Sequence, residues 1–357
     1  MTTANEELVK PRVDFDEVKN IVFDVYGLKV LNIRELNGYD DKNFHVVVDE
    51  AVNGNAYIEK SFNDGYVLKI VNSLDSKDKP GFEAQTELLW FLNQNGIRCP
   101  KPVVTKQQKS FGIVSLVSGT HIVRLLEFIP GDILYKLENT NERLYFDIGV
   151  FTAKIDNVLQ KFDHPAFHKY MQWCLGSAPD ILNYIHAVEE PRQTLVKKTI
   201  SEFKSRVSSI EDELTKGIIH GDINEQNLII DANNEKLFVK ALIDFGDTHY
   251  CCYLYELALA MTYMIFLTND IDSGGYVLGG YFSFRTITEN EFQLLKICVM
   301  TRFCQSLVLG AFANLREPEN KYVLTTARKG WNLLEELMAK PEDYVLNRWK
   351  ELSLQKL

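Results

Sequence analysis

Two short motifs carry side chains suited to phosphoryl transfer. The first is His-Gly-Asp-Ile-Asn-Glu-Gln-Asn at residues 220–227, directly before an apolar run. Transfer to an alcohol needs a carboxylate that holds the hydroxyl group and accepts its proton, together with oxygen ligands for Mg²⁺. A loop that ends in a strand can bring Asp222 and Asn227 into one cleft. The alternative is a turn in which both side chains only make local hydrogen bonds.

The second motif is Ile-Asp-Phe-Gly-Asp at residues 243–247, at the end of a predicted strand. A carboxylate here can bridge Mg²⁺ to the β- and γ-phosphates of a nucleotide, so Asp244 is the candidate ligand. Asp-Phe-Gly alone is a common tripeptide. Its position 22 residues after Asp222, with a predicted hairpin between them, makes the two motifs together a strong indication of a kinase centre.

A lysine on a predicted strand could reach the nucleotide phosphates. Lys69 lies in Tyr-Val-Leu-Lys-Ile, an alternating apolar pattern. The next predicted helix supplies Glu83 and Glu87, one turn apart, as partners that could orient it, and we prefer Glu83. The alternatives are a solvated lysine and two surface carboxylates.

Two further segments could contact a nucleotide. The polar turn at 38–45 lies between the first two strands but lacks a GlyXGlyXXGly signature; the side chain of Asn43 and the amides of residues 41–44 are its possible phosphate contacts. The segment 125–128, which includes Glu127, could present backbone groups to a purine. Arg302 and Glu256 lie in helix-rich sequence, where we expect charges satisfied by structural partners rather than ligand contacts.

Hydrophobic periodicity predicts two lobes. A capping box at Asp14 and Glu17 begins a helix that ends at Gly27, and short β-branched runs to Ile70 predict an antiparallel sheet. Residues 1–128 are the predicted nucleotide-binding lobe and 129–357 the predicted helical catalytic and substrate lobe. Further predicted elements are a helix at 80–96, strands at 101–105, 112–117 and 121–128, a hairpin joining 228–231 to 239–243, and helices at 141–161, 190–215, 253–268, 288–313 and 319–338.

The two motifs together resemble the aminoglycoside phosphotransferase and choline kinase branch of the protein-kinase-like fold. The resemblance implies an α+β fold, with an antiparallel-sheet N-lobe, a mostly helical C-lobe and a nucleotide in the cleft between them. It implies Asp222 as catalytic base, Asn227 and Asp244 as Mg²⁺ ligands, and Lys69 on the nucleotide phosphates. Where the wider family usually has a glutamate seven residues before Leu92, this chain has Gln85.

Further segments narrow the resemblance within that branch. Tyr-Asp-Asp-Lys-Asn-Phe-His-Val at 39–46, Arg-Phe-Cys-Gln-Ser-Leu-Val at 302–308 and Pro-Glu-Asn-Lys-Tyr at 318–322 are similar to members that use GTP. These members phosphorylate the side-chain hydroxyl of 5-hydroxy-L-lysine, and the resemblance implies the same small cationic amino acid here. The motifs themselves would also serve another amino-alcohol, such as choline, ethanolamine or homoserine. A catalytically silent binding protein would be expected to lack one of Asp222, Asn227 and Asp244, and all three are present.

Composition excludes several other classes. With 49 acidic and 39 basic side chains the formal charge is −10, which disfavours nucleic acid and anionic membranes as partners and suits a cationic substrate. The longest apolar segment, 253–267, is expected to be a buried core helix, and the first eleven residues show no secretory signal. Six cysteines lack metal-site spacing and fit core positions in a reduced, cytoplasmic protein. No Ala-Pro-Glu segment follows Asp244, which disfavours a protein kinase.

Overall fold

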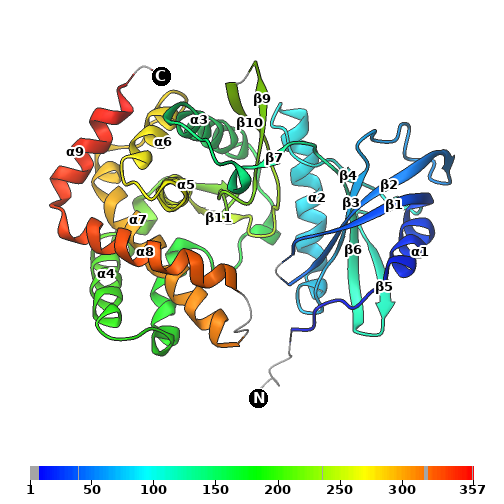
Figure 1. Cartoon of the computed structure of the whole chain (residues 1–357), viewed down its shortest axis with the longest axis horizontal. Helices are drawn as coiled ribbons and strands as arrows, with labels where there is room; N and C mark the ends of the chain where they lie inside the picture. The colour runs from blue at the N-terminus through cyan, green and yellow to red at the C-terminus, as the bar shows by residue number, and fades with distance from the viewer. Residues whose placement is uncertain (1–7, 39, 235, 317–320, 356) are drawn as a thin grey trace. The chain divides into compact units, whose positions relative to one another are not determined.

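The computed structural model describes residues 8–38, 40–234, 236–316, 321–355 and 357. The chain divides into two compact units, Met1–Pro130 and Gly131–Leu357. The first is built on an antiparallel sheet and the second is mostly helical, which confirms the predicted α+β class (Figure 1).

A six-stranded antiparallel sheet forms the centre of the first unit. Its strand order is β1-β2-β3-β6-β4, with β5 also paired to β6. Helices α1 and α2 lie on opposite faces of this sheet (Figure 1). The elements are α1 (Phe15–Tyr26), β1 (Leu28–Leu36), β2 (Lys42–Asn53), β3 (Tyr66–Ile70), α2 (Lys79–Gln94), β4 (Pro102–Val103), β5 (Gly112–Leu116) and β6 (Gly119–Glu127).

The predicted capping box begins α1. The Asp14 carboxylate accepts from the N–H of Glu17 at 2.8 Å, and the Glu17 carboxylate accepts from the N–H of Asp14 at 2.9 Å. Gly27 ends the helix in the left-handed conformation, with φ 71°. The buried face of α1, which includes Val18 and Val22, packs on buried sheet residues such as Leu68. Alternation along β3 then leaves Lys69 on the opposite face of the sheet.

The second unit packs its helices around two small sheets. One sheet has the order β10-β9-β7 and the other pairs β11 with β8, all antiparallel. The predicted hairpin is confirmed, because β9 and β10 pair directly. The strands are β7 (Asp132–Ile133), β8 (Lys216–Ile219), β9 (Leu228–Asn233), β10 (Lys236–Leu242) and β11 (His249–Cys252). The helices are α3 (Glu142–Leu159), α4 (Arg192–Arg206), α5 (Tyr253–Thr268), α6 (Ser273–Phe282), α7 (Glu289–Arg316), α8 (Lys321–Ala339) and α9 (Glu342–Ser353).

Helix α6 is absent from the sequence-based prediction because four of its ten residues are glycine. Close helix packing explains these glycines. A Cβ on Gly280 would lie 1.8 Å from the carbonyl oxygen of Phe146 in α3, and one on Gly149 would lie 1.9 Å from that of Val277. The two backbones therefore approach so closely that a side chain at either glycine would separate them.

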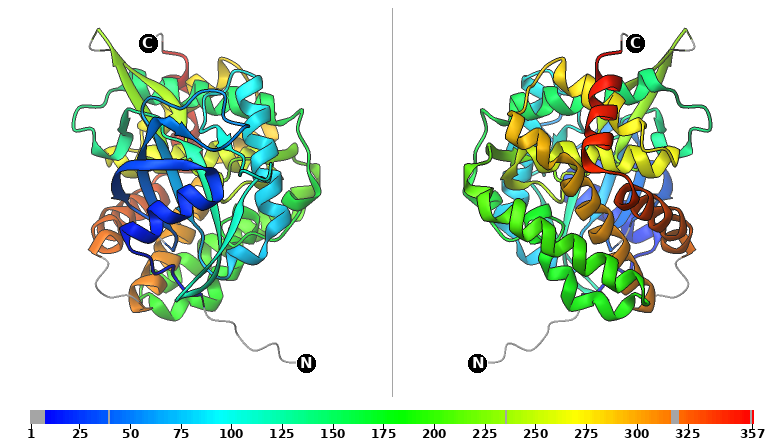
Figure 2. Two further views of the ribbon diagram at one scale, coloured as in Figure 1. Left: turned by 90° about the vertical axis from the view of Figure 1, so that its right-hand side faces the viewer. Right: turned by 90° about the vertical axis from the view of Figure 1, so that its left-hand side faces the viewer.

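Helix α9 is also absent from the prediction, whereas α7 confirms the helix predicted at 288–313. The C-terminal helix α9 (red in Figure 2) packs beside α6, and its Trp349 donates to the carbonyl oxygen of Ile271 at 2.9 Å. The expected core helix at 253–267 is confirmed, because most side chains of α5 are buried. A longer apolar stretch, Glu289–Leu315 in α7, has 83% of its most apolar window buried inside the protein. It is therefore a core helix. The predicted helix at 190–215 is shorter, because α4 ends at Arg206 and a 3₁₀ segment, Ser208–Glu213, follows.

Between α3 and α6 lies a buried carboxylate. Asp156 is fully buried, and its Oδ2 accepts from the hydroxyl of Tyr281 at 2.8 Å. Its Oδ1 has no hydrogen-bond partner within the described part of the chain. Burial raises the pKa of Asp156 to about 7, an effect opposed by the Tyr281 hydrogen bond and by Arg285.

This raised pKa predicts a pH-dependent stability. Between the ordinary pKa of 3.8 and about 7 the folded protein holds a proton on Asp156 that the unfolded chain releases. The stabilisation is therefore present at low pH and is lost as the pH rises through 7. From pH 5 to pH 8 the wild type should lose ~3 kcal/mol relative to Asp156→Asn, which cannot titrate. Urea unfolding at both pH values measures this, with exposed Asp24→Asn as the control; parallel pH profiles for wild type and Asp156→Asn would contradict it.

Candidate active site

One buried carboxylate fixes the start of the loop at 220–227. Glu256, in the first turn of α5, is fully buried and accepts from the N–H groups of His220 at 2.8 Å and Gly221 at 3.0 Å. Burial raises the pKa of Glu256, while these two N–H groups and Arg302 act to lower it. A buried carboxylate without such donors would be strongly unfavourable. Glu256 thus has structural partners rather than a ligand contact, as expected, and these partners position the loop.

A glycine is required where the loop turns. Gly221 has φ 81°, and a Cβ there would lie 2.5 Å from the carbonyl oxygen of Asp247. The two motifs therefore meet at this residue, and the larger residue that protein kinases usually have at this position would not fit the present conformation.

The buried His220 connects the two motifs. Its Nε2 lies 3.2 Å from the carbonyl oxygen of Ile243, which can only accept, so Nε2 carries the proton and Nδ1 accepts from the N–H of Asp222 at 3.2 Å. Burial lowers the pKa of His220 to about 4, which keeps this ring neutral. The ring also packs edge-on against Phe245, with centroids 4.6 Å apart.

Asp222 and Asn227 are brought together, as the first motif predicts. The amide Nδ2 of Asn227 donates to Oδ2 of Asp222 at 2.7 Å and to its backbone oxygen at 3.0 Å. These bonds use both amide hydrogens and leave the amide oxygen of Asn227 available as a ligand. The other carboxylate oxygen of Asp222 accepts from Asn224 at 2.8 Å.

Asp244 and Asp247 add negative charge beside Asp222. Asp244 adopts φ 59°, in the left-handed region that non-glycine residues rarely occupy. The preceding Ile243 donates its N–H to the carbonyl oxygen of Asn227 at 2.9 Å, which ties this turn to the loop. Burial, followed by Asp247, raises the pKa of Asp222 well above its ordinary value; Asp244 adds to this and Arg302 opposes it. Carboxylate and amide oxygens that concentrate negative charge in this way suit a hard divalent cation.

Arg302 contacts this centre, a role that its position in helix-rich sequence did not indicate. It is almost fully buried, and its Nη2 lies 3.9 Å from Oδ1 of Asp222. The same guanidinium donates to the carbonyl oxygen of Trp173 at 2.7 Å and to the hydroxyl of Tyr263 at 3.1 Å. The place of Asp247 beside Asp222 was also not predicted from the sequence. Asp247 is the last residue of the second motif, and this position was the one feature of the sequence that could have indicated its role.

In the first unit, Lys69 pairs with Asp41 rather than with Glu83. The Nζ of Lys69 lies 3.2 Å from Oδ2 of Asp41, whose other oxygen accepts from the backbone N–H of Asn72 at 2.8 Å. Glu83 and Glu87 are both exposed, and the expected pair between Lys69 and Glu83 is not formed among the described residues. Residues 42–44 belong to β2, so the turn that could lie over phosphates is shorter than predicted.

The inner face of α2 explains why Glu83 points outward. Its buried Gln85 accepts from Nη1 of Arg124 at 2.7 Å, and its Thr86 hydroxyl lies 3.3 Å from Nη2 of the same residue. Arg124 is directly opposite Lys69 in the β3–β6 pair. Because successive helix residues are rotated by about 100°, a helix that turns Gln85 toward the sheet directs Glu83 to solvent.

The other predicted nucleotide contacts are placed as follows. Asn43 pairs with Lys69 across β2 and β3, and its Nδ2 donates to the carbonyl oxygen of Asn37 at 3.0 Å. The Glu127 carboxylate forms two bonds to Arg98, at 2.8 and 2.6 Å. The backbone N–H groups of Glu127 and Phe128 already donate within the first unit. This segment therefore offers a purine fewer free backbone groups than expected.

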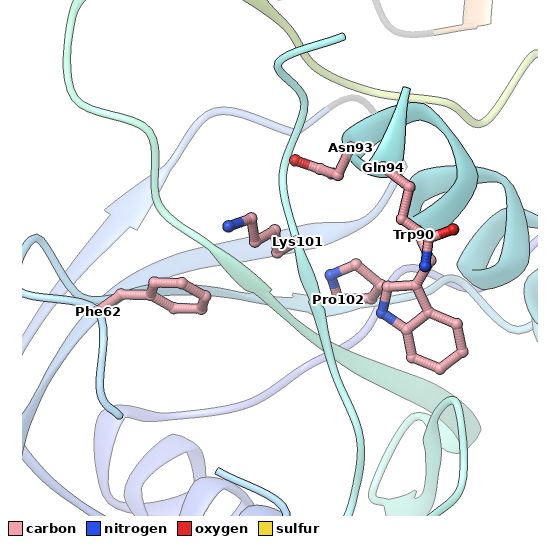
Figure 3. Close-up of a pocket in the computed structure, with 6 residues that line it drawn as sticks. All are labelled: Phe62, Trp90, Asn93, Gln94, Lys101 and Pro102. Atoms are coloured by element: carbon pink, nitrogen blue, oxygen red, sulfur yellow. The ribbon is translucent and has the colours of Figure 1, made fainter. Parts of the chain in front are cut away.

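A pocket of about 390 Å³ lies elsewhere in the first unit. It is formed between α2 and the region of β4, and none of the predicted site residues lines it (Figure 3). Its lining residues are Phe62, Trp90, Asn93, Gln94, Lys101 and Pro102.

Comparison with known sequences agrees with this geometry. Residues 34–286 match the family described as "Phosphotransferase enzyme family". The chain belongs to this family. Two relatives of this phosphotransferase extend the match to nearly the full length. Hydroxylysine kinase of Xenopus laevis is 35% identical over 361 residues, covering 96% of this chain and 94% of that protein. Hydroxylysine kinase of Bos taurus is 33% identical, covering 97% and 95%.

Solved structures share the fold of this phosphotransferase. A microcompartment-associated aminopropanol kinase superposes with a TM-score of 0.69 at 18% identity, covering 91% of this chain and 98% of that one. The GDP complex of an aminoglycoside 2′-phosphotransferase-IIIa gives 0.55 at 15% identity, covering 87% and 93%. The predicted protein-kinase-like class is confirmed by these similarities.

The position of Glu256 predicts a selective loss of turnover in this phosphotransferase. Glu256→Gln leaves one amide oxygen in place of two carboxyl oxygens, of which Oε1 accepts from His220 and Oε2 from Gly221, so one of these two hydrogen bonds is lost. We expect kcat for phosphoryl transfer to fall roughly 10- to 100-fold, since Asp222 is no longer held in place. Steady-state kinetics below the unfolding temperature measure this.

Glu291→Gln is the matched control, because Glu291 is also buried and accepts from a backbone N–H, that of Thr288 at 2.8 Å, outside the loop. It should lose stability with kcat unchanged. Equal losses of kcat in both variants would mean that Glu256 has no specific positioning role.

Proposed function

We propose that this phosphotransferase moves the γ-phosphoryl group of GTP to the side-chain hydroxyl of 5-hydroxy-L-lysine. The observation that carries the proposal is the direct hydrogen bond between Asp222 and Asn227, with the charges of Asp244 and Asp247 beside them. The identity of one third or more to hydroxylysine kinases along almost the whole chain supports the acceptor. The guanine nucleotide rests on the sequence resemblance, since proteins of the same fold have been solved with GDP and with AMP-PNP.

Asp222 is the proposed catalytic base. Its carboxylate would accept a hydrogen bond from the substrate hydroxyl and take the proton as the oxygen forms its bond to the γ-phosphorus; the bond to the β-phosphate oxygen breaks and GDP leaves. The raised pKa of Asp222 makes it a stronger base than an ordinary aspartate. Asn224 and Asn227 each donate to one of its oxygens and so orient the carboxylate.

Asn227 and Asp244 are the proposed Mg²⁺ ligands. When bound, Mg²⁺ would neutralise charge on the phosphates during transfer. The free amide oxygen of Asn227 and the exposed carboxylate of Asp244 are the hard oxygen donors this ion prefers. The cation would also offset the repulsion among the neighbouring carboxylates.

Lys69 is the proposed phosphate contact of the first unit, with Asp41 rather than Glu83 holding its ammonium in the present conformation. The six cysteines are free, which supports the proposal that the enzyme works in the reducing cytoplasm.

Substitution of Asp222 tests the reaction. Asp222→Asn should lower kcat with GTP and 5-hydroxy-L-lysine by a factor on the order of 10²–10⁴, because the base is lost while the shape of the side chain is kept. Nucleotide binding, measured by calorimetry, should change little. Asp231→Asn is the control: this half-buried residue of β9 pairs with Lys240 of β10, outside the loop at 220–227.

Lysine, choline, ethanolamine and homoserine, with either GTP or ATP, complete the assay. Turnover confined to 5-hydroxy-L-lysine is the expected result. If another amino-alcohol is turned over faster, the assignment of 5-hydroxy-L-lysine as acceptor is wrong. If ATP is preferred, the assignment of GTP as phosphoryl donor is wrong. Loss of nucleotide binding in Asp222→Asn would assign that residue a structural role.

Removal of a proposed ligand tests the metal. Asp244→Asn should raise the Mg²⁺ concentration for half-maximal turnover by at least ~10-fold, since a neutral amide oxygen binds the ion less strongly. A Mg²⁺ titration at saturating nucleotide measures this. An unchanged titration midpoint would remove Asp244 from the ligand set.

A further inference from the structure

Three potential metal ligands meet outside the phosphoryl-transfer loops. The ligand atoms of Cys174, His249 and Cys251 all lie within 4.8 Å of one another, and the two sulfurs are 2.9 Å apart. His249 and Cys251 are alternate residues of β11 and so project from the same side of the strand. Cys174 comes from a segment 77 residues earlier, just before the 3₁₀ stretch Leu175–Ala187. The fold therefore creates a cluster that cysteine spacing does not reveal.

The histidine of this cluster is set up as a ligand. Its Nδ1 lies 2.6 Å from the carbonyl oxygen of Asp247, which can only accept, so Nδ1 carries the proton. The lone pair is then on Nε2, which is buried and has no hydrogen-bond partner within the described part of the chain. His249 itself is 2% exposed. Metal-bound histidines commonly donate their second ring nitrogen to a backbone carbonyl in this way.

The donor types select the kind of metal. Two thiols and one imidazole are soft or borderline donors, which suit Zn²⁺ and not the hard ions Mg²⁺ and Ca²⁺. Zn–S bonds of about 2.3 Å and Zn–N bonds of about 2.0 Å place the donors of a tetrahedral site roughly 3–4 Å apart. The ligand atoms lie within 4.8 Å of one another, and the two sulfurs, now 2.9 Å apart, would separate by slightly less than about 1 Å to bind the ion. Cys174 is only partly buried, so the cluster is accessible from solvent.

A disulfide between Cys174 and Cys251 is the competing arrangement. It would use both sulfurs but leave Nε2 of His249 buried without a partner, which is costly. Metal binding satisfies all three groups. Both cysteines are free in this structure.

We propose that Cys174, His249 and Cys251 bind one Zn²⁺ ion, at a site separate from the proposed Mg²⁺ ligands and independent of the substrate assignment. Each thiol gives up its proton to solvent as its sulfur binds the ion. Contact with Cys251 and burial raise the pKa of Cys174, so without metal both protons are expected to stay in place and their release accompanies binding.

The proposed ion would also connect β11 to the segment that holds Arg302. Arg302 donates to the carbonyl oxygen of Trp173, and Gln305 donates to the carbonyl oxygens of Gln172 and Cys174 at 2.9 and 3.0 Å. A metal on Cys174 would therefore restrain the carbonyl that positions Arg302 beside Asp222. Through His249 it would also restrain the carbonyl of Asp247. The expected role is structural positioning.

The test is metal uptake by the purified full-length protein. The protein is stripped with a chelator, held in excess Mg²⁺ to occupy the proposed catalytic ligands, and titrated with Zn²⁺; elemental analysis should find about one tightly bound ion per chain. Titration with Co²⁺ should give the visible bands of a tetrahedral ion and a thiolate charge-transfer band. These spectra are recorded on the wild-type protein, so the result does not depend on whether a variant folds.

Cys174→Ser and Cys251→Ser should each lose the tightly bound ion and the charge-transfer band. Cys298→Ser, a buried cysteine of α7 outside the cluster, should keep both. The proposal is overturned by no uptake, by uptake that survives in both cluster variants, or by loss of two titratable thiols without metal, which would indicate the disulfide instead.

Discussion

The carboxylate of Glu256 cannot be buried in an apolar helix without hydrogen-bond donors, and this requirement shapes the whole centre. It is the one charged residue of α5, whose other side chains are almost all buried and mostly apolar. The two donors available to it are the N–H groups of His220 and Gly221. The loop must therefore turn at residue 221 and run close to Asp247. Only glycine fits there, because a Cβ at 221 would clash with the carbonyl oxygen of Asp247. From this start, His220 can reach Ile243 and Asn227 can reach Asp222.

The predicted site residues of the two units have neighbours of opposite charge. In the second unit, carboxylates gather around Asp222 and raise its pKa, with Arg302 as the opposing charge. This is an environment suited to a cation and to proton acceptance. In the first unit, Lys69 and Arg124 stand opposite each other on β3 and β6, each held by a polar partner. Arg124 is buried against α2, so of these two cations Lys69 is the one proposed to contact a nucleotide.

Gln85 illustrates how one residue changes a pairing. A glutamate at this position would bring a negative charge to Arg124, on the strand next to Lys69. The neutral amide instead accepts from Arg124 and leaves the lysine to Asp41. Lys69 on β3 thus has a different neighbour from the one predicted. The chain's similarity to the hydroxylysine kinases nevertheless extends over nearly the whole length.

The local sequence determined the elements and the two motifs. Capping at Asp14, the alternation in β3, the hairpin of β9 and β10, and the pairing of Asp222 with Asn227 all depend on residues close in the chain, and each could be predicted. Contacts between residues that are distant in the sequence were decided only by the tertiary structure. The anchoring role of Glu256, the contact of Arg302 with Asp222, the outward turn of Glu83 and the meeting of Cys174 with His249 and Cys251 depend on packing between distant segments. The glycine-rich α6 belongs with them, because its helix propensity is poor and close contact with α3 stabilises it. Spacing along the chain carries no information on such contacts, since they arise from which faces are buried together.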